Sequence, residues 1–215
     1  MTWHRDKTSE PRRSYHHGNL RDALMKAALA LIAEKGPAGF TIAEAARAAG
    51  VSPAAPYRHY KDRDGLMADI ALRGFEALES ELLREWNAGK PNARAAFDRV
   101  MRAYLDFSRR QTAQYAAMFE AGLSFAQFPE LHTAGDRARD VLRDACTALI
   151  APLPEAQRPP VTMMTLHIWS LVHGVASLFA RGDAARRPIP MSAEDLLDAA
   201  ILIYFDGLGI KRPEL

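Results

Sequence analysis

The sequence predicts an all-α fold of about nine helices, in which an N-terminal three-helix unit is joined by a long helix to a helical C-terminal domain. Three observations predict this class. Apolar residues recur at spacings of three and four along most of the chain, prolines cluster between these segments, and no segment alternates apolar and polar residues as a strand does. With 48% hydrophobic and 25% charged residues among 215, the chain has the composition of a soluble globular protein.

The first 18 residues are polar and lack the apolar region of a signal peptide, so no export signal is expected. Their basic side chains belong either to a solvated end or to a tail that rests on phosphates. The first helix is expected to begin at Asn19, a favourable N-cap residue. It is expected to end at Lys35, because Gly36 is a common residue just after a helix.

Two short helices joined by a tight turn are expected between Thr41 and Tyr60. Thr41 and Glu44 have the spacing of a capping box, in which each side chain bonds a backbone N–H of the first turn. The helix that begins there is expected to end at Gly50, because a residue without a Cβ reverses the chain with little strain. A helix, a glycine-containing turn and a second helix together form a helix-turn-helix.

Prolines shape the second helix of this unit. Ser52 suits its N-cap and Pro53 its first position, where a missing N–H is no loss. Pro56 lacks the donor for the first intrahelical hydrogen bond and its ring crowds the Ser52 carbonyl, so a short or 3₁₀-like first turn is expected. Pro56 and Tyr60 lie four residues apart and are assigned to the core face.

The outward face of this helix is small at its start and basic and aromatic at its end. Small side chains allow close approach to a groove, and Tyr, Arg and His side chains reach phosphates or base edges. The candidate DNA-binding residues are Thr41, Ser52, Pro53, Ala54, Ala55, Tyr57, Arg58, His59, Lys61 and Arg63. The alternative is a packing turn in a helical protein that does not bind DNA.

Two segments resemble a known family. The segment 51–66, VSPAAPYRHYKDRDGL, is similar to the recognition helix and following segment of the TetR/AcrR (tetracycline-repressor-like) family of bacterial transcriptional regulators. The segment 15–36, YHHGNLRDALMKAALALIAEKG, resembles that family's first helix. The resemblance is strongest to the branch whose ligand domain carries a Trp, a His and a Gly, here Trp169, His173 and Gly174.

The resemblance implies a DNA-binding transcriptional regulator, usually a repressor. Such a protein binds a palindromic operator in double-stranded DNA as a homodimer and is released when a small molecule binds its C-terminal domain. The resemblance also assigns phosphate contacts to Lys61 and Arg63. Half-sites about one helical turn apart, ~34 Å, would follow from the two-fold axis of the dimer.

The charge distribution favours a nucleic-acid partner at the N-terminal end. Residues 1–63 carry 11 Lys and Arg against 6 Asp and Glu, a net charge of +5, and the remaining residues carry 17 against 20, a net charge of −3. A basic N-terminal third on a mildly acidic remainder is typical of a protein that holds nucleic acid at one end. Many neutral enzymes have similar local excesses, so the charge is supporting evidence only.

A long helix is expected from about Arg63 to Trp86, capped by Asp62; at ~1.5 Å per residue it is about 35 Å long and can join two domains. The predicted division is residues 1–62, a basic tail and helix-turn-helix DNA-binding domain, and 63–215, a helical effector-binding and dimerisation domain. In the family that the chain resembles, this helix carries ligand-induced movement to the DNA heads. The later helices are expected at 93–111, 113–123, 130–151, 158–181 and 193–208.

The segment 161–180 contains no Asp, Glu, Lys or Arg, but six Thr, His and Ser side chains argue against a membrane span. A helix this uncharged in a soluble protein is covered on nearly all sides. We expect a second copy to cover it, with helices 161–181 and 193–208 of each subunit forming a four-helix homodimer interface. A purely intramolecular core is the alternative.

Apolar, aromatic and soft side chains gather in the C-terminal region and suit a hydrophobic or aromatic small molecule. The candidate ligand-binding residues are Phe107, Met118, Phe119, Phe125, Met164, Trp169 and His173. The competing interpretation is that these residues are ordinary core, and a hydrogen-bonded structural role is favoured for His173.

No catalytic motif, metal site or cofactor-binding motif is found, so we predict neither an enzyme nor a bound cofactor. Adjacent His16 and His17 do not have the spacing of a helical metal site. The single cysteine, Cys146, excludes an internal disulfide and suits the cytoplasm. The alternatives to a regulator are a DNA-binding protein without a ligand, and a helical small-molecule-binding protein or enzyme with a structural helix-turn-helix.

Overall fold

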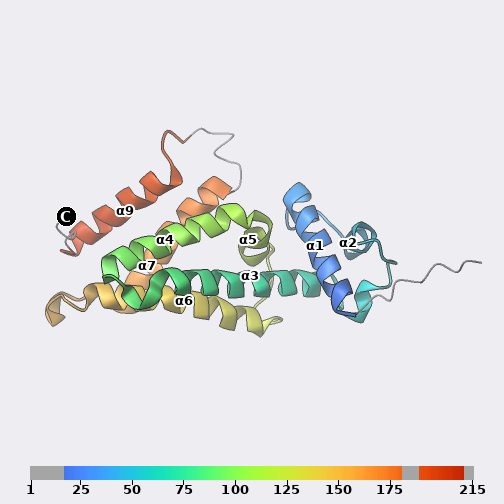
Figure 1. The fold of residues 1–215 in the computed structure, drawn as a ribbon, viewed down its shortest axis with the longest axis horizontal. Helices are drawn as coiled ribbons and strands as arrows, with labels where there is room; N and C mark the ends of the chain where they lie inside the picture. Colours follow the sequence, from blue (N-terminus) through green and yellow to red (C-terminus); the bar gives the residue numbers. More distant parts are fainter. Residues whose placement is uncertain (1–16, 181–188, 211–215) are drawn as a thin grey trace, which may run out of the picture.

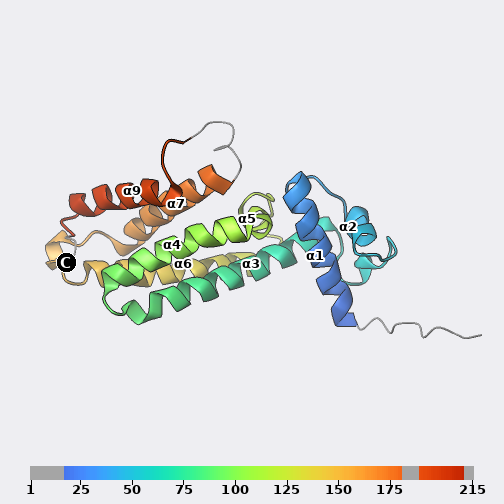
Figure 2. The same cartoon turned by 45° about the horizontal axis from the view of Figure 1, so that its top comes forward.

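The protein is built entirely from helices in the part of the chain that the computed structural model describes, residues 17–180 and 189–210. That part contains eight α-helices and no strand, which confirms the predicted class. Figures 1 and 2 show an elongated molecule with a small head at one end and a helical body extending from it. The α-helices are α1 (His17–Lys35), α2 (Ile42–Ala48), α3 (Arg63–Trp86), α4 (Ala93–Arg110), α5 (Thr112–Phe119), α6 (Pro129–Ile150), α7 (Val161–Ala180) and α9 (Ala193–Gly207).

Local capping fixes the residues at which α2 and α3 begin. The Thr41 hydroxyl accepts a bond from the Glu44 N–H at 3.2 Å, and the Glu44 carboxylate accepts one from the Thr41 N–H at 2.8 Å, so the capping box is confirmed. Asp62 caps α3 by accepting the Gly65 N–H at 2.9 Å. The chain reverses after α2 at Gly50, whose φ of +72° is in the region that favours glycine.

The second helix of the helix-turn-helix is the main correction to the sequence prediction. No α-helix forms between Ser52 and Tyr60; a turn leads into a single 3₁₀ turn, η1 (Pro56–Arg58), and Ala55 stands at its cap position without a side-chain bond. Pro53 and Pro56 each remove a backbone donor, so only bonds of the 3₁₀ type form until the Tyr60 N–H reaches the Pro56 carbonyl at 2.9 Å.

The start of α1 is a second correction. The helix begins at His17, so Asn19 lies inside it and is not its cap. The later helices, by contrast, agree with the predicted ranges to within a few residues, and α3 has the predicted bounds, Arg63–Trp86.

Two separate clusters of buried side chains form the core, and α3 contributes to both. The head cluster contains Leu66, Met67 and Ile70 of α3 together with side chains of α1 and α2. The body cluster contains Phe75, Leu78 and other residues further along α3, packed against α4, α6, α7 and α9. A displacement of α3 in the body therefore moves a wall of the head.

The short helix α5 also joins the two cores. Its Ala117 is buried in the head cluster, while Tyr115 and Met118 are buried in the body cluster. It packs so closely on α3 that a Cβ added at Gly74 of α3 would lie only 2.6 Å from the Met118 sulfur. Both α3 and α5 thus contribute to the two cores.

One helix, spanning Val161–Phe179 of α7, is long and apolar enough to cross a membrane by length and composition, with a mean hydropathy of 1.3. Buried core helices of soluble proteins pass the same test. One side of α7 is buried in the body cluster, where Met164, Ile168 and Val172 are fully covered.

Candidate nucleic-acid interface and ligand cavity

The helix-turn-helix presents a small, basic and aromatic surface to solvent. Pro56 and Tyr60 are buried, as predicted, and the outward side chains between them are exposed, including Tyr57 at 58%. The exposed candidates are Ser52, Pro53, Ala54, Tyr57, Arg58, His59 and Lys61, and Ala55 is half-buried. The structure thus leaves seven of the ten predicted DNA-binding residues exposed, six on the turn from Ser52 to His59 and Lys61 just after it.

Thr41 and Arg63 differ from these seven because their side chains have partners within the head, although Thr41 is exposed. Thr41 lies at the start of α2, where its hydroxyl serves the capping box. The Arg63 guanidinium lies 5.1 Å from the centre of the Phe40 ring and bonds Asp64 at 3.0 Å, with 25% of its side chain exposed. Arg63 therefore supports the head by packing as well as by charge.

An ionic network centred on the buried Asp69 fixes the end of the exposed turn to α1 and α3. Asp69 of α3 is only 6% exposed at its side chain, and Arg21 of α1 donates two bonds of 2.7 Å to its two carboxylate oxygens. The Tyr60 hydroxyl donates to the same carboxylate at 2.6 Å. Arg73 lies 3.9 Å from Asp69 and bonds Asp22 of α1 at 3.2 Å.

The network shifts the pKa values of its members in directions that keep Asp69 charged and Tyr60 neutral. Burial would raise the pKa of Asp69, but the hydrogen bonds from Arg21 and Tyr60 outweigh it and hold that pKa below its ordinary value. Burial, helped by the bond to Asp69, raises the pKa of Tyr60. Sequence analysis missed Arg21 and Asp69, since they lie 48 positions apart.

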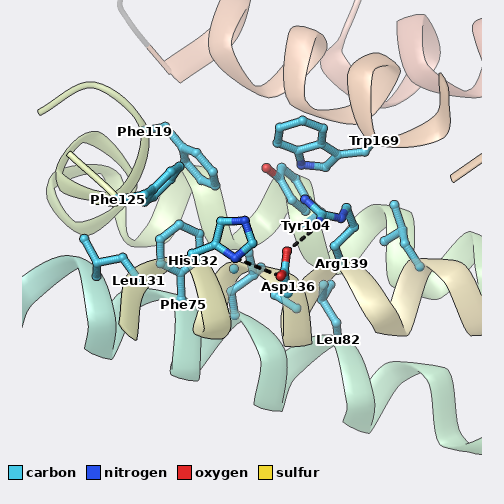
Figure 3. Close-up of a pocket in the computed structure, with 14 residues that line it drawn as sticks. Phe75, Leu82, Tyr104, Phe119, Phe125, Leu131, His132, Asp136, Arg139 and Trp169 are labelled. Carbon is cyan, nitrogen blue, oxygen red and sulfur yellow. Dashed lines mark hydrogen bonds and ion pairs between the residues drawn. The ribbon is translucent and has the colours of Figure 1, made fainter. Parts of the chain in front are cut away.

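A cavity of about 280 Å³ lies in the body, between α3, α6 and α7 (Figure 3). Its walls are mainly aromatic and aliphatic, and Trp169 of α7 lies over one side. The lining residues are Phe75, Leu78, Leu82, Tyr104, Phe119, Phe125, Leu131, His132, Gly135, Asp136, Ala138, Arg139, Leu142 and Trp169. A concave, mostly apolar pocket with a few polar groups has the character of a small-molecule site.

The charged side chains of the cavity and its histidine come from one side of α6. Asp136 lies between His132, whose Nδ1 is 3.0 Å from its carboxylate, and Arg139, with which it forms an ion pair. Figure 3 draws both interactions as dashed lines. All three side chains are partly exposed, at 60%, 37% and 40% for His132, Asp136 and Arg139, so they form the mouth of the cavity.

A hydrogen-bonded aromatic cluster supports the inner wall. His173 Nδ1 lies 3.0 Å from the hydroxyl of Tyr104 and 2.8 Å from that of Tyr115, which joins α4, α5 and α7. The ring of His173 stacks on Trp169 with 5.4 Å between ring centres. Burial raises the pKa of Tyr104 well above its ordinary value, so its hydroxyl stays neutral. This arrangement fits the structural role favoured for His173.

Of the predicted ligand-binding residues, Phe119, Phe125 and Trp169 line the cavity. Phe107, Met118 and Met164 are buried in the body cluster and do not line it, and His173 stands behind the wall. The residues that sequence analysis missed include all the charged ones at the mouth. Their spacing along α6 is that of an exposed helix face, so the sequence carried no signal that they border a cavity.

The outer side of α7 and α9 carries exposed apolar residues. Met163, Leu166 and Leu178 of α7 are 44% to 49% exposed, and Ile203 of α9 is 74% exposed. The two helices pack against each other, and His167 bonds Tyr204 at 3.2 Å across them. A Cβ added at Gly174 would meet no atom within 4 Å. Among the described residues, no group of three or more His, Cys, Asp or Glu side chains forms a metal site.

Comparison with protein families gives two matches that together span both cores. Residues 24–70 match the family described as bacterial regulatory proteins, tetR family, and residues 97–203 match the tetracyclin repressor-like C-terminal domain. No curated protein matches the chain. The Trp-His-Gly branch suggested by Trp169, His173 and Gly174 stays a prediction.

Several solved structures share the fold. A protein of unknown function from Rhodococcus sp. RHA1 is 27% identical, with a TM-score of 0.72 over 91% of this chain and 98% of that one. PfmR, a TetR family transcriptional regulator from Thermus thermophilus, is 21% identical, with a TM-score of 0.66 over 88% of this chain and 99% of that one. A regulatory protein of the tetR family from Rhodococcus RHA1 is 18% identical, with a TM-score of 0.68 over 90% of this chain and 98% of that one.

Regulators of this family are cytoplasmic DNA-binding proteins that act as dimers with small-molecule effectors, and they are not enzymes. Both family matches fall on the parts of the chain that carry the corresponding features, the exposed helix-turn-helix and the helical body with its cavity. The chain belongs to the TetR family of transcriptional regulators.

Proposed function

We propose that this protein is a cytoplasmic repressor that binds a palindromic operator as a homodimer and leaves it when a small hydrophobic or aromatic molecule occupies the body cavity. The observation that carries the proposal is the position of α3, which lines the cavity with Phe75, Leu78 and Leu82 and packs into the head with Leu66 and Ile70. One rigid helix thus connects the ligand site to the reading head.

In this proposal the DNA contacts divide into two groups. Lys61, with Arg63, the basic tail and the N-terminal end of α2 at Thr41, holds phosphates, and the exposed turn from Ser52 to His59 lies against base edges. Pro53, Ala54 and Ala55 carry no side-chain hydrogen-bonding group, so methyl contacts and DNA shape supply much of the sequence preference. The functional division is between residues 1–62 and residues 63–215.

The second subunit covers the exposed apolar side of helices 161–181 and 193–208. Leu166, Leu178 and Ile203 are the kind of side chains that a two-fold helical interface buries, and the open space beside Gly174 allows close approach of another helix. Such a dimer holds two heads at a fixed separation, as a palindrome with half-sites about one helical turn apart requires.

Release follows from the different affinity of ligand and operator for two arrangements of the heads. A ligand that fills the cavity presses on Phe75 and Leu78 and shifts α3, while α5 transmits the same change through Ala117. The coupling needed is typically ~1–3 kcal/mol, which a small displacement of a packed helix can supply.

Fluorescence-anisotropy titration tests the proposal directly. The purified protein is titrated against duplexes from upstream of its own gene and its neighbours and against a random duplex, across a salt series. We expect saturable binding to one palindrome, at least ~10³-fold tighter than to the random duplex. Equal, weak and salt-sensitive binding to every duplex from these regions would contradict the proposed operator recognition.

A further inference from the structure

We infer that the cavity takes a small carboxylic acid with an apolar ring or chain, bound with its carboxylate at Arg139 in place of Asp136. This inference rests on the proposed function, because it names the chemical class of the effector for the same cavity. It is carried by the contrast between the uncharged interior and the three charged or titratable side chains at the mouth.

The interior selects the apolar part of the molecule. Phe75, Leu78, Leu82 and Leu131 are buried side chains of the walls, and no charged side chain comes from α3, α4 or α7. The Tyr104 hydroxyl points to His173 and is engaged there at 3.0 Å. At about 280 Å³ the cavity is at the small end of ligand sites, so it suits a molecule of roughly one or two rings.

The mouth then has to receive the polar end of the ligand. Asp136 and Arg139 are both partly exposed, and an ion pair of this kind is worth only ~0–1 kcal/mol, so a ligand can replace one of its members at little cost. An Arg guanidinium binds a carboxylate through two parallel hydrogen bonds, which fixes the orientation of an acid as well as holding it.

The arrangement of partners favours an anion over a cation. When a ligand carboxylate binds Arg139, Asp136 keeps its 3.0 Å contact with His132 Nδ1, so both carboxylates have a partner. When a ligand ammonium binds Asp136 instead, Arg139 loses the only ion-pair partner that it has among the described residues. The Arg139 guanidinium then lies beside the positive charge of the ligand. A neutral alcohol gains no charge pairing and breaks none. The expected order of affinity is therefore acid, then alcohol, then amine.

The test uses three compounds of one shape: phenylpropanoate, phenylpropanol and phenylpropylamine. Isothermal titration calorimetry on the full chain measures each affinity, and quenching of tryptophan fluorescence, compared with a Trp169→Phe variant, reports whether the compound lies in the cavity. We expect the acid to bind ~10-fold more tightly than the alcohol, the amine to bind most weakly, and Trp169→Phe to lose the quenching.

Variants at the mouth give opposite shifts that a purely structural role does not produce. Arg139→Met is expected to abolish the ~10-fold preference for the acid, and Asp136→Asn to strengthen acid binding several-fold, because it removes the competing carboxylate. Arg137→Met is the matched control, since Arg137 lies on the same helix, bonds Glu79 at 2.8 Å and does not line the cavity. Thermal unfolding verifies that each variant is folded.

Each other outcome overturns the inference. An amine that binds best and depends on Asp136, an alcohol that equals the acid, or a set of compounds that all fail to bind would each exclude the proposed acid class. The anisotropy titration without ligand separates this failure from a failure of the regulator: intact operator binding with no acid preference rejects only the effector class.

Discussion

The hydroxyl of Tyr60 lies 2.6 Å from a carboxylate oxygen of Asp69. The Asp69 side chain is only 6% exposed and also accepts hydrogen bonds from Arg21 of α1. Tyr60 is the last residue of the exposed turn, so this contact sets the orientation of the turn relative to α3. The same helix lines the cavity in the body. Asp69 therefore joins the helix that lines the cavity to the exposed turn.

Replacing Tyr60 by Phe should destabilise the head by about 1–2 kcal/mol, because it removes a hydrogen bond to a buried charge while keeping the ring in the core. Urea unfolding measures this change. Tyr57→Phe is the control, since Tyr57 is on the same turn but 58% exposed, and its unfolding free energy should stay within ~0.5 kcal/mol of the wild type. Equal stability of both variants would contradict a structural role for the Tyr60–Asp69 bond.

Stability should fall as the pH rises above about 10. Burial and the bond to Asp69 raise the pKa of Tyr60 in the folded state, so the unfolded chain releases this proton at a lower pH than the folded one. The stabilisation is complete below the ordinary tyrosine pKa and is lost as the pH rises towards the folded value. Tyr60→Phe should flatten this alkaline limb in pH-dependent unfolding, though only in part, because Tyr104 and Tyr204 also have raised pKa values.

Changing each of the two basic residues after the turn to Ala should have different effects on stability. Lys61→Ala should weaken binding to all duplexes, reduce the salt slope by about 1 and leave stability unchanged, because Lys61 is exposed. Arg63→Ala should also lower stability, by ~0.5–2 kcal/mol, because Arg63 packs on Phe40.

Changes on the face of the turn itself should instead alter which sequence is preferred. Tyr57→Ala is expected to change the ranking of operator variants more than the affinity for random DNA, as measured by anisotropy at fixed salt. If Lys61→Ala and Tyr57→Ala have the same effect on operator and random DNA, the division between phosphate and base contacts is wrong.

Ile203→Glu should break the proposed dimer. Ile203 is 74% exposed on α9, and a buried unpaired carboxylate at a two-fold interface would occur twice. Sedimentation equilibrium should show a monomer for this variant, and operator affinity should fall with it. Leu83→Glu is the control, because Leu83 is an exposed apolar residue of α3, outside α7 and α9. A dimer that survives Ile203→Glu would place the interface elsewhere.

The sequence by itself determined the helices, because their signals are local. The Thr41–Glu44 capping box, the Asp62 cap and the apolar spacing through Trp86 act within one or two turns, and the structure reproduces them. The sequence also predicted the exposed face of the turn, because the spacing of Pro56 and Tyr60 assigned them to the buried face. The extent of the second helix was overestimated, since two prolines remove more backbone bonds than one cap restores, and the start of α1 was placed two residues too late.

Tertiary structure alone decided which of these helix faces meet. Arg21 and Asp69 form an ion pair although they lie 48 positions apart in the sequence. The cavity combines side chains of five helices, α3 to α7, with one from the segment between α5 and α6. The sequence presents His132, Asp136 and Arg139 as an ordinary solvated helix face, and Phe107 and Met164 as equally good cavity residues. Periodicity tells which side of a helix is apolar, but the crossing of helices distant in sequence determines whether that side closes a core or leaves a space.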